Sequence, residues 1–398
     1  MATIMFCPFP EFGHLNPTLK LARALKQAGH RVCYLGLADF EDYIRSQGLE
    51  FIPILERRYP KGKSGERSAQ MKLGRLELIM LEELQADAQV RTMPFKGIKE
   101  EIGAIIRDNH PDLLIVDFLI GGLAYLVAQE YGVASAVLSV TLLEGWMLGE
   151  PAPEAGYQEL PVLVLCPEAF DFKNARRKAN RFYIEPSVDL QRQEPHAFPW
   201  EALDQSKPLI YASLGSESHL YEQSPDIFRA IIEAMNEKPE WQLVLAIGPH
   251  LKTTDFEPLP ANVLMVNWAP QLKMLERAAI MITHGGLGAV KECIMLSVPM
   301  IVFPCRWDQP FNAARVVAHG LGMRGNINQV TAQQVANLID SVATNPTLKR
   351  RMAAMSQTFR QIEDSRIGVK ILEGIMRDFR LTPNPTTASP PWRESLSI

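Results

Sequence analysis

A short apolar run that ends in two glycines and continues as a helical pattern limits what this chain can fold into. The run extends from Ala279 to Thr283, stops at His284-Gly285-Gly286, and leads into a helix-like segment that carries Glu292. Glycines where a strand becomes a helix let the backbone approach an anion, and the first helical amides and the helix dipole attract it. The turn therefore predicts a diphosphate site in an α/β fold, with His284 as an additional donor.

Side chains on either side of this turn suit the rest of a nucleotide sugar. Trp268 offers a flat face for a base, and Glu292 can accept hydrogen bonds from ribose hydroxyls. Asp308 and Gln309 can bond the hydroxyls of a sugar, unless Asp308 only caps a following helix. The local pattern thus indicates a nucleotide sugar as the ligand, although a glycine turn near a tryptophan also occurs in unrelated proteins.

Apolar strands alternate with helical patterns along both halves of the chain. Strands are expected at 3–6, 31–37, 112–117 and 133–140 in the first half, and at 208–214, 242–247 and 279–283 in the second. This alternation predicts parallel sheets, and 398 residues exceed one ordinary domain. A helical tail is expected from Thr347 to about Phe379. The polar, proline-rich stretch from Glu185 to Lys207 is typical of an interdomain linker.

Three groups follow strands at the sheet edge where ligands of open α/β sheets bind. His14 follows the first strand, Asp117 ends the strand at 112–117, and Ser216 lies in the Ser213-Leu-Gly-Ser turn after the strand at 208–214. A carboxylate hydrogen-bonded to a histidine fixes its tautomer and stabilises the imidazolium. Each group has a structural alternative: a loop histidine, a helix N-cap and an ordinary turn serine, respectively.

Composition excludes several classes of function. A formal net charge of -4 and an isoelectric point near 6.1 argue against a nucleic-acid partner. The 5 cysteines are scattered without a CxxC pair, which favours buried thiols over disulfides or a metal site. No apolar run reaches the roughly 20 residues of a membrane span, and no signal segment is recognisable. We therefore expect a cytoplasmic protein.

Two further stretches keep alternative interpretations. From Leu73 to Leu84, apolar residues recur at helical spacing, so the segment packs on the core, meets an apolar substrate, or makes peripheral contact with a membrane surface. The irregular stretch from Thr141 to Gly156 could line a substrate cleft. The polar, glycine-containing segment from Arg57 to Gly65 is expected to be a mobile surface loop, because it lacks the first glycine of a phosphate-binding P-loop.

The second half of the chain contains an ordered block of residues, Trp268-Ala-Pro-Gln271, His284-Gly-Gly286, Glu292, Val298-Pro299, Pro304 and Asp308-Gln309. This block resembles the donor-binding signature of the UDP-glycosyltransferase family, which includes plant small-molecule glycosyltransferases and bacterial macrolide glycosyltransferases. Ala289 departs from the pattern, because the family usually has serine or threonine there.

The resemblance implies a GT-B fold, in which two Rossmann-like parallel-sheet domains face each other across a cleft. Residues 1–185 would bind the acceptor, 186–207 would form the linker, 208–365 would bind the donor, and 366–398 would hold a helix returning to the first domain and a flexible tail. The donor-binding residues that it implies are Ser216, Trp268, Gln271, His284, Gly286, Gly288, Ala289, Glu292, Asp308 and Gln309.

The implied reaction is the inverting transfer of a hexose, with glucose suggested by Asp308-Gln309, from a UDP-sugar to a hydroxyl of a small lipophilic molecule. The segment Gly13-His14-Leu-Asn-Pro17 matches the family's general-base motif, and Asp117 matches its activating aspartate. No cofactor and no metal are expected. Two alternatives remain: a nucleotide-sugar epimerase of the same architecture, and a non-catalytic partner protein that resembles a transferase.

Overall fold

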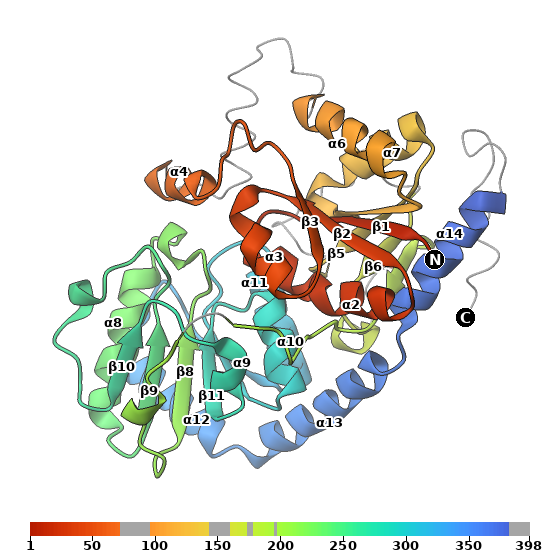
Figure 1. Cartoon of the computed structure of the whole chain (residues 1–398). Coiled ribbons are helices and arrows are strands. Elements are labelled where there is room, and N and C mark those ends of the chain that lie inside the picture. Colours follow the sequence, from red (N-terminus) through yellow and green to blue (C-terminus); the bar gives the residue numbers. More distant parts are fainter. Residues whose placement is uncertain (72–95, 143–159, 173–177, 195–196, 382–398) are drawn as a thin grey trace.

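The computed structural model describes residues 1–71, 96–142, 160–172, 178–194 and 197–381. Two parallel sheets, of 7 and 6 strands, lie beside each other with helices packed on their faces (Figure 1). This arrangement confirms the predicted α/β class. The amphipathic stretch at 73–84 and most of the possible cleft segment at 141–156 lie outside the described residues.

The first sheet has the strand order β3-β2-β1-β4-β5-β6-β7. Its strands are β1 (Thr3–Cys7), β2 (Arg31–Gly36), β3 (Glu50–Pro53), β4 (Leu113–Asp117), β5 (Ala134–Ser139), β6 (Val162–Val164) and β7 (Arg181–Tyr183). Phe6 of β1 lies opposite Tyr34 of β2 on one side and Ile115 of β4 on the other. Because the strand order reverses between β1 and β4, the loops after these strands leave a crevice at their carboxyl ends.

The second sheet repeats this plan in the order β10-β9-β8-β11-β12-β13. Its strands are β8 (Leu209–Ser213), β9 (Gln242–Ala246), β10 (Val263–Val266), β11 (Ala278–Thr283), β12 (Met300–Val302) and β13 (Gly322–Arg324). The order reverses between β8 and β11, where Ser213 lies opposite Thr283 at the strand ends. Both sheets therefore have their switch point, the usual ligand position, beside their first strand.

Helices cover both sheets and connect their strands. Among the described residues of the first half they are α1 (Phe12–Leu15), α2 (Leu19–Gln27), α3 (Glu41–Ser46), α4 (Lys63–Met71), α6 (Lys96–Asn109) and α7 (Gly121–Tyr131). In the second half they are α8 (Ser224–Ala234), α9 (Gln271–Leu275), α10 (Leu287–Met295), α11 (Gln309–His319), α12 (Ala332–Ala343), α13 (Pro346–Glu363) and α14 (Ile367–Leu381). Since helices lie on both faces, the strands are near-continuous apolar runs, and every residue of β4 (LLIVD) is buried.

The helical tail differs from the sequence prediction, because it consists of two helices instead of one. α13 ends at Glu363, Arg366 adopts a left-handed conformation with φ 50°, and α14 begins at Ile367. α13 packs on α10 beside the second sheet, and α14 packs on α2 and β5 of the first (Figure 1). The chain therefore ends its helical part on the half in which it began.

The segment predicted as a mobile loop, from Arg57 to Gly65, is only partly a loop. α4 begins at Lys63, and the side chain of Tyr59 is fully buried. Ser64 Oγ donates a hydrogen bond of 2.5 Å to Asp39. The prediction was wrong for this part of the segment because a buried tyrosine and a helix start outweigh its polar composition.

Buried polar contacts join the two halves of the molecule. Arg315 of α11 pairs with Asp171 at 2.8 Å, and neither side chain is more than 2% exposed. Lys291 of α10 donates from Nζ to the carbonyls of Leu165 and Pro186, at 2.7 Å each. Burial lowers the pKa of Lys291 to about 8. A buried charge without partners is costly, so these contacts favour one arrangement of the two sheets.

Candidate functional site

A cavity of about 470 Å³ lies where the loops after β1, β4, β8 and β11 meet, two from each sheet. Of the predicted site residues, the cavity is lined by His14, Ser216, Trp268, Gln271, His284, Gly286, Gly288, Ala289, Glu292, Asp308 and Gln309. Asp117 lies behind His14. The fold therefore brings all the predicted site residues to one place, at the switch points of both sheets.

His14 and Asp117 meet because the strands that precede or carry them are neighbours. His14 lies in α1 after β1, Asp117 ends β4, and His14 Nδ1 is 2.8 Å from Asp117 Oδ2. The imidazole is 22% exposed and the carboxylate 2%, so the histidine separates Asp117 from the cavity. The other oxygen of Asp117 accepts from the Leu119 amide at 3.0 Å and caps the short helix that follows. Asp117 thus makes both contacts considered from sequence, the histidine pair and the N-cap.

The pKa of His14 is the result of opposing effects. Burial lowers it, but the charge and hydrogen bond of Asp117, followed by the charges of Glu11 and Asp308, raise it above the ordinary 6.5. With the Nδ1 proton donated to Asp117, Nε2 is the nitrogen that can take a proton. The arrangement is suited to a general base whose protonated form is stabilised.

The turn after β11 presents backbone amides to the cavity. Gly285 has φ 87°, its amide donates to Thr283 Oγ1 at 3.2 Å, and its carbonyl accepts from Asn312 at 2.9 Å. Gly286 occupies the N-cap position of α10 and has no side chain to bond the first amides of that helix. These amides and the helix dipole can therefore stabilise an anion.

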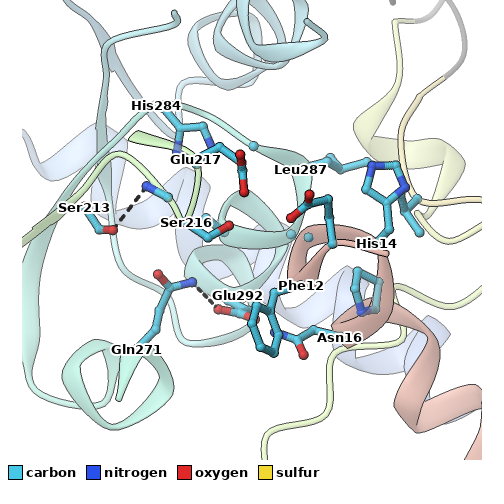
Figure 2. Close-up of a pocket in the computed structure, with 18 of the residues that line it drawn as sticks. Phe12, His14, Asn16, Ser213, Ser216, Glu217, Gln271, His284, Leu287 and Glu292 are labelled. Carbon is cyan, nitrogen blue, oxygen red and sulfur yellow. Dashed lines mark hydrogen bonds between the residues drawn. The ribbon is translucent and has the colours of Figure 1, made fainter. Parts of the chain in front are cut away.

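His284 is held closely by two glycines from different loops. A Cβ on Gly215 would lie 2.8 Å from His284 Cε1, and one on Gly286 would lie 2.7 Å from Nε2. Burial lowers the pKa of His284 to about 4, so the imidazole is neutral at pH 7 and donates one hydrogen bond. Figure 2 shows His284 and Ser216 on the other side of the pocket from His14.

Glu292 of α10 has protein donors on both carboxylate oxygens. Gln271 donates to Oε2 at 2.6 Å (Figure 2), and Arg192 donates to Oε1. Arg192 also donates to Glu194 at 2.9 Å. Arg192 and Glu194 were not predicted as site residues, because a polar stretch between domains carries no signal for a contact with a residue about a hundred positions away.

Trp268 lies at the cavity beside an aromatic residue from the first half of the chain. It follows β10 and is half-buried, and its ring centroid is 5.9 Å from that of Phe12 in α1, with the ring planes at 59°. The tryptophan is therefore placed where a planar base could stack. Phe12 was not predicted, since a phenylalanine near the first strand is more often part of the core.

Asp308 connects the two halves across the cavity. Its Oδ2 accepts from Thr141 Oγ1 at 2.7 Å and from Asn312 Nδ2 at 2.8 Å. Burial raises the pKa of Asp308, and the hydrogen bonds from Thr141 and Asn312 and the charge of His14 oppose this increase. Asp308 stands at the N-cap of α11 but makes no side-chain capping bond, so the alternative that it only caps this helix is wrong.

The side-chain amide of Gln309 is already engaged by the protein. Its Oε1 accepts from the amides of Cys305 and Arg306, both at 2.9 Å, and its Nε2 donates to the Tyr221 hydroxyl at 3.1 Å. The amide thus fixes the loop before α11. One Nε2 hydrogen is left for a ligand in this arrangement.

Two negative findings hold for the part of the chain that the structure describes. No group of three or more His, Cys, Asp or Glu in it could hold a metal ion. None of its helices is both long enough and apolar enough to span a bilayer.

Two parallel sheets joined across a cavity, with a histidine–carboxylate pair on one side and a glycine turn at a helix N-terminus on the other, form the arrangement of the GT-B fold. Residues 240–361 match the family described as Erythromycin biosynthesis protein CIII-like, C-terminal domain. The chain is similar to this family in these residues and, over nearly its whole length, to bacterial glycosyltransferases.

Similarity to individual relatives extends over nearly the whole chain. NDP-glycosyltransferase YjiC of Bacillus subtilis (strain 168) is 23% identical, over 92% of this chain and 96% of its own. Demethyllactenocin mycarosyltransferase of Streptomyces fradiae is 24% identical, over 94% of this chain and 87% of its own.

Solved structures support the fold. The glycotransferase of kitacinnamycin superposes with a TM-score of 0.73 at 24% identity, covering 94% of this chain and 98% of that one. CalG4, the calicheamicin glycosyltransferase, superposes with a TM-score of 0.70 at 20% identity, covering 96% and 100%. The predicted GT-B architecture is confirmed by these similarities, which concern the fold alone.

Proposed function

We propose that this protein transfers a hexose, with inversion, from a UDP-sugar to a hydroxyl of a small lipophilic acceptor. The observation that carries the proposal is the contact of 2.8 Å between His14 and Asp117 in the same cavity as the glycine turn of α10. One side of the cavity can remove a proton from an acceptor, and the other can stabilise a departing diphosphate.

In this mechanism, Nε2 of His14 takes the proton of the acceptor hydroxyl as its oxygen attacks the anomeric carbon. The new bond from the acceptor oxygen to this carbon forms while the bond from the carbon to the diphosphate oxygen breaks, and UDP leaves with the electron pair. Attack from the face opposite the leaving group inverts the configuration. Asp117 orients His14 and stabilises the imidazolium through the contact at Nδ1.

The charge that develops on the diphosphate would be stabilised by the first amides of α10, after Gly286, and by the neutral imidazole of His284. Gly288 and Ala289 lie in the first turn of this helix, so they would contribute backbone amides rather than side-chain contacts. Ser216, which lines the cavity from the turn after β8, would face the diphosphate. In a cavity shielded from water such preorganised donors act strongly, because they need no reorganisation during the reaction.

The nucleoside and the sugar are assigned to the remaining residues of the cavity. Trp268 would stack on uracil, and Gln271 and Glu292 would bond the ribose hydroxyls. Asp308 would bind the sugar through Oδ1, since the side-chain donors bonded to it in the described residues go to Oδ2. Gln309 would add a donor, and the pair suits the adjacent equatorial hydroxyls of glucose.

The acceptor side of the cavity supports a lipophilic substrate. Its lining near His14 consists largely of apolar and aromatic residues, Phe9, Phe12, Phe118, Leu119 and Val140. All come from the first half of the chain, which agrees with acceptor binding by residues 1–185 and donor binding by residues 208–365. These boundaries and the linker at 186–207 are part of the proposal.

The test is a transfer assay with purified full-length protein. UDP-glucose, UDP-galactose, dTDP-glucose and a dTDP-deoxysugar would be offered with a panel of lipophilic alcohols and phenols, and nucleotide release and the anomeric configuration of the product would be measured. We expect the fastest release with UDP-glucose, strictly dependent on an acceptor. Conversion of the nucleotide sugar without acceptor would indicate an epimerase. Donor binding without release for any acceptor would indicate a non-catalytic protein.

A substitution of His14 tests whether the activity depends on this site. His14→Ala should lower turnover by about 10²–10⁴-fold, the usual contribution of a general base, while UDP affinity stays nearly unchanged. Unaltered turnover in this variant would contradict the assignment of His14 and leave the donor assignment untouched.

A further inference from the structure

We propose that the linker stretch is part of the nucleoside site, with Arg192 as the positioning residue that holds Glu292 for ribose recognition. The inference rests on the proposed donor class. Arg192 lies in the stretch between the two sheets and not in either donor loop, yet its guanidinium contacts the carboxylate of Glu292 inside the cavity.

The contacts of Arg192 are buried and paired. Its side chain is 6% exposed, that of Glu292 is 8% exposed, and Glu194 accepts from the same guanidinium at 2.9 Å. Burial of an arginine and two carboxylates is costly unless their geometry is well satisfied, so Arg192 has few alternative positions. A planar guanidinium between two carboxylates restricts both, because its donors point in fixed directions.

Glu194 connects Arg192 to the start of α9, the helix that carries Gln271. It accepts from the Leu272 amide at 3.1 Å through Oε2, in the first turn of α9, which begins at Gln271. Gln271 in turn donates to Glu292 at 2.6 Å. These contacts close into a ring through the Leu272 amide, next to Gln271 in the chain, and the ring holds both Glu292 and the start of α9.

This ring leaves capacity for a ligand. A carboxylate has about four acceptor positions, and Glu292 uses one on Oε1 for Arg192 and one on Oε2 for Gln271. Two positions remain, which is the number that the two ribose hydroxyls require. Arg192 can thus stay in place when a nucleoside binds, and it keeps Glu292 oriented.

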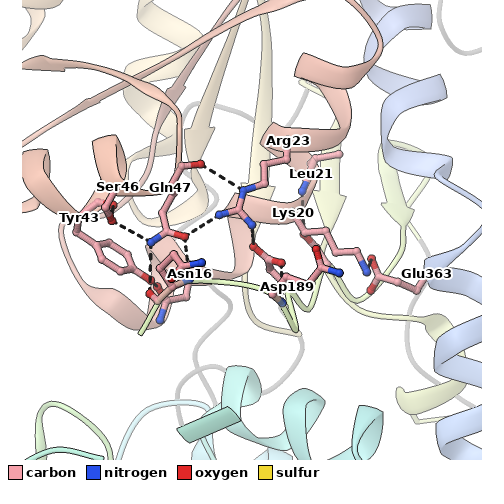
Figure 3. Close-up of polar contacts among 12 residues, drawn as sticks. Asn16, Lys20, Leu21, Arg23, Tyr43, Ser46, Gln47, Asp189 and Glu363 are labelled. Carbon is pink, nitrogen blue, oxygen red and sulfur yellow. Dashed lines mark hydrogen bonds and ion pairs between the residues drawn. The ribbon is translucent and has the colours of Figure 1, made fainter. Parts of the chain in front are cut away.

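The linker segment is itself fixed to the first half of the molecule. Asp189 accepts from Arg23 of α2 (Figure 3). The Gln193 amide donates to Gln47 Oε1 at 3.2 Å. Arg23 also donates to Gln47 at 2.6 Å. These contacts hold the backbone around Arg192 but do not touch Glu292. They provide a control, because disturbing them loosens the linker without removing the partner of Glu292.

The experiment compares UDP with 2′-deoxyuridine diphosphate, which differs only in the 2′-hydroxyl, by calorimetric titration of the full-length protein. The unaltered protein should bind UDP about 10- to 100-fold more tightly, the usual effect of one hydrogen bond to a charged acceptor. In Arg192→Gln the ratio should fall to about threefold or less. Arg192→Lys keeps the charge but not the planar geometry, so it should give an intermediate ratio.

The control variant is Arg23→Gln. Any loss of affinity in this variant should be equal for the two nucleotides, so the affinity ratio should stay the same. An unchanged ratio in Arg192→Gln, or an equal loss of ratio in Arg23→Gln, would overturn the inference. If Arg192→Gln does not fold, Arg192→Lys takes its place in the test. An affinity ratio in Arg192→Lys as large as that of the unaltered protein would then overturn the inference. Failure of the unaltered protein to bind either nucleotide would remove the proposed donor class, and the inference with it. Tight but equal binding of the two nucleotides would overturn the ribose assignment and this inference, and would leave the proposed donor class in place.

Discussion

Replacing Asp117 by asparagine tests the histidine–carboxylate pair with little change in shape. The side chain is 2% exposed, and its Oδ2 is 2.8 Å from His14 Nδ1. Asparagine keeps an oxygen that can accept from the Leu119 amide, so the N-cap contact at 3.0 Å can persist. Its NH2 group, however, donates toward His14, which favours the tautomer with the proton on Nε2. That tautomer cannot take a proton from an acceptor.

The expected loss of turnover in Asp117→Asn follows from the contact between His14 and Asp117 that is lost. A hydrogen bond to a charged group contributes about 1.5–3 kcal/mol, so loss of imidazolium stabilisation alone corresponds to about 10- to 100-fold in turnover. The wrong tautomer adds to this loss, and the sum approaches the 10²–10⁴-fold expected for removal of the base. The double variant His14→Ala, Asp117→Asn should be little slower than His14→Ala, because the two residues act as a unit.

The pH dependence gives a second and independent readout. The pKa of His14 is raised because the Asp117 charge and hydrogen bond outweigh the lowering by burial. Since the base must be neutral, kcat/KM of the unaltered enzyme should fall as the pH decreases through this raised pKa. In Asp117→Asn the charge and hydrogen bond that mainly raise the pKa of His14 are lost, whereas burial still lowers it. The acid limb of the profile should therefore move to lower pH.

The same linkage affects stability with a defined sign. A raised pKa means that the folded state binds the His14 proton more tightly than the unfolded state. The stabilisation is fully present below about pH 6.5, the ordinary value, and is lost as the pH rises through the folded-state pKa. Asp117→Asn should therefore lose more stability at pH 6 than at pH 9.

Initial-rate measurements over pH 5–10, with UDP-glucose and one accepted alcohol, would check the predicted shift of the acid limb. Urea unfolding at pH 6 and pH 9 would check the predicted loss of stability. An acid limb at the same pH in both proteins would refute the reasoning, whatever the loss in rate. Losses that multiply in the double variant would refute the coupled action of the two residues.

Three further predictions concern the sugar, the diphosphate and the interface. Asp308→Ala should lower the rate of sugar transfer by about tenfold or more while UDP affinity stays nearly unchanged. An altered UDP affinity with the same sugar preference would contradict sugar binding by Asp308. Gly286→Ala places a methyl group 2.7 Å from His284 Nε2, so calorimetry should show weaker UDP binding without a comparable change in melting temperature. Arg315→Met should cost about 3–5 kcal/mol in urea unfolding, and joint replacement of Asp171 by leucine should recover part of it.

The fold was predictable from sequence to the extent that each strand is a short apolar run with a turn after it. The regular alternation of strands and helices sets the parallel pairing, and the right-handed connections then leave few topologies. The break between α13 and α14 was not predictable from the local pattern, because Arg366 adopts a left-handed conformation without the glycine or proline that usually marks such a point. Only the family resemblance implied a separate helix after residue 365.

Part of the site follows from the same reasoning. His14 and Asp117 were placed at strand ends, and the structure brings them together because β1 and β4 are neighbours at the switch point. The contacts of Arg192 could not be found in this way. A charged residue in a polar stretch has no periodicity that specifies a partner, and its contact with Glu292 depends on how the two sheets are placed.

The interface between the sheets bears on catalysis more than on stability. A buried ion pair such as Arg315–Asp171 adds little compared with an apolar replacement of both partners, but loss of one partner is costly. Such a pair, like Lys291 with its two carbonyl acceptors, is satisfied in only one relative placement of the sheets. His14 comes from the first sheet and Asp308 from the second, so this placement sets where an acceptor oxygen and a sugar would meet. Because a misplacement of about 1 Å can cost about 10²-fold in rate, we infer that the buried charges serve the alignment of the two sheets.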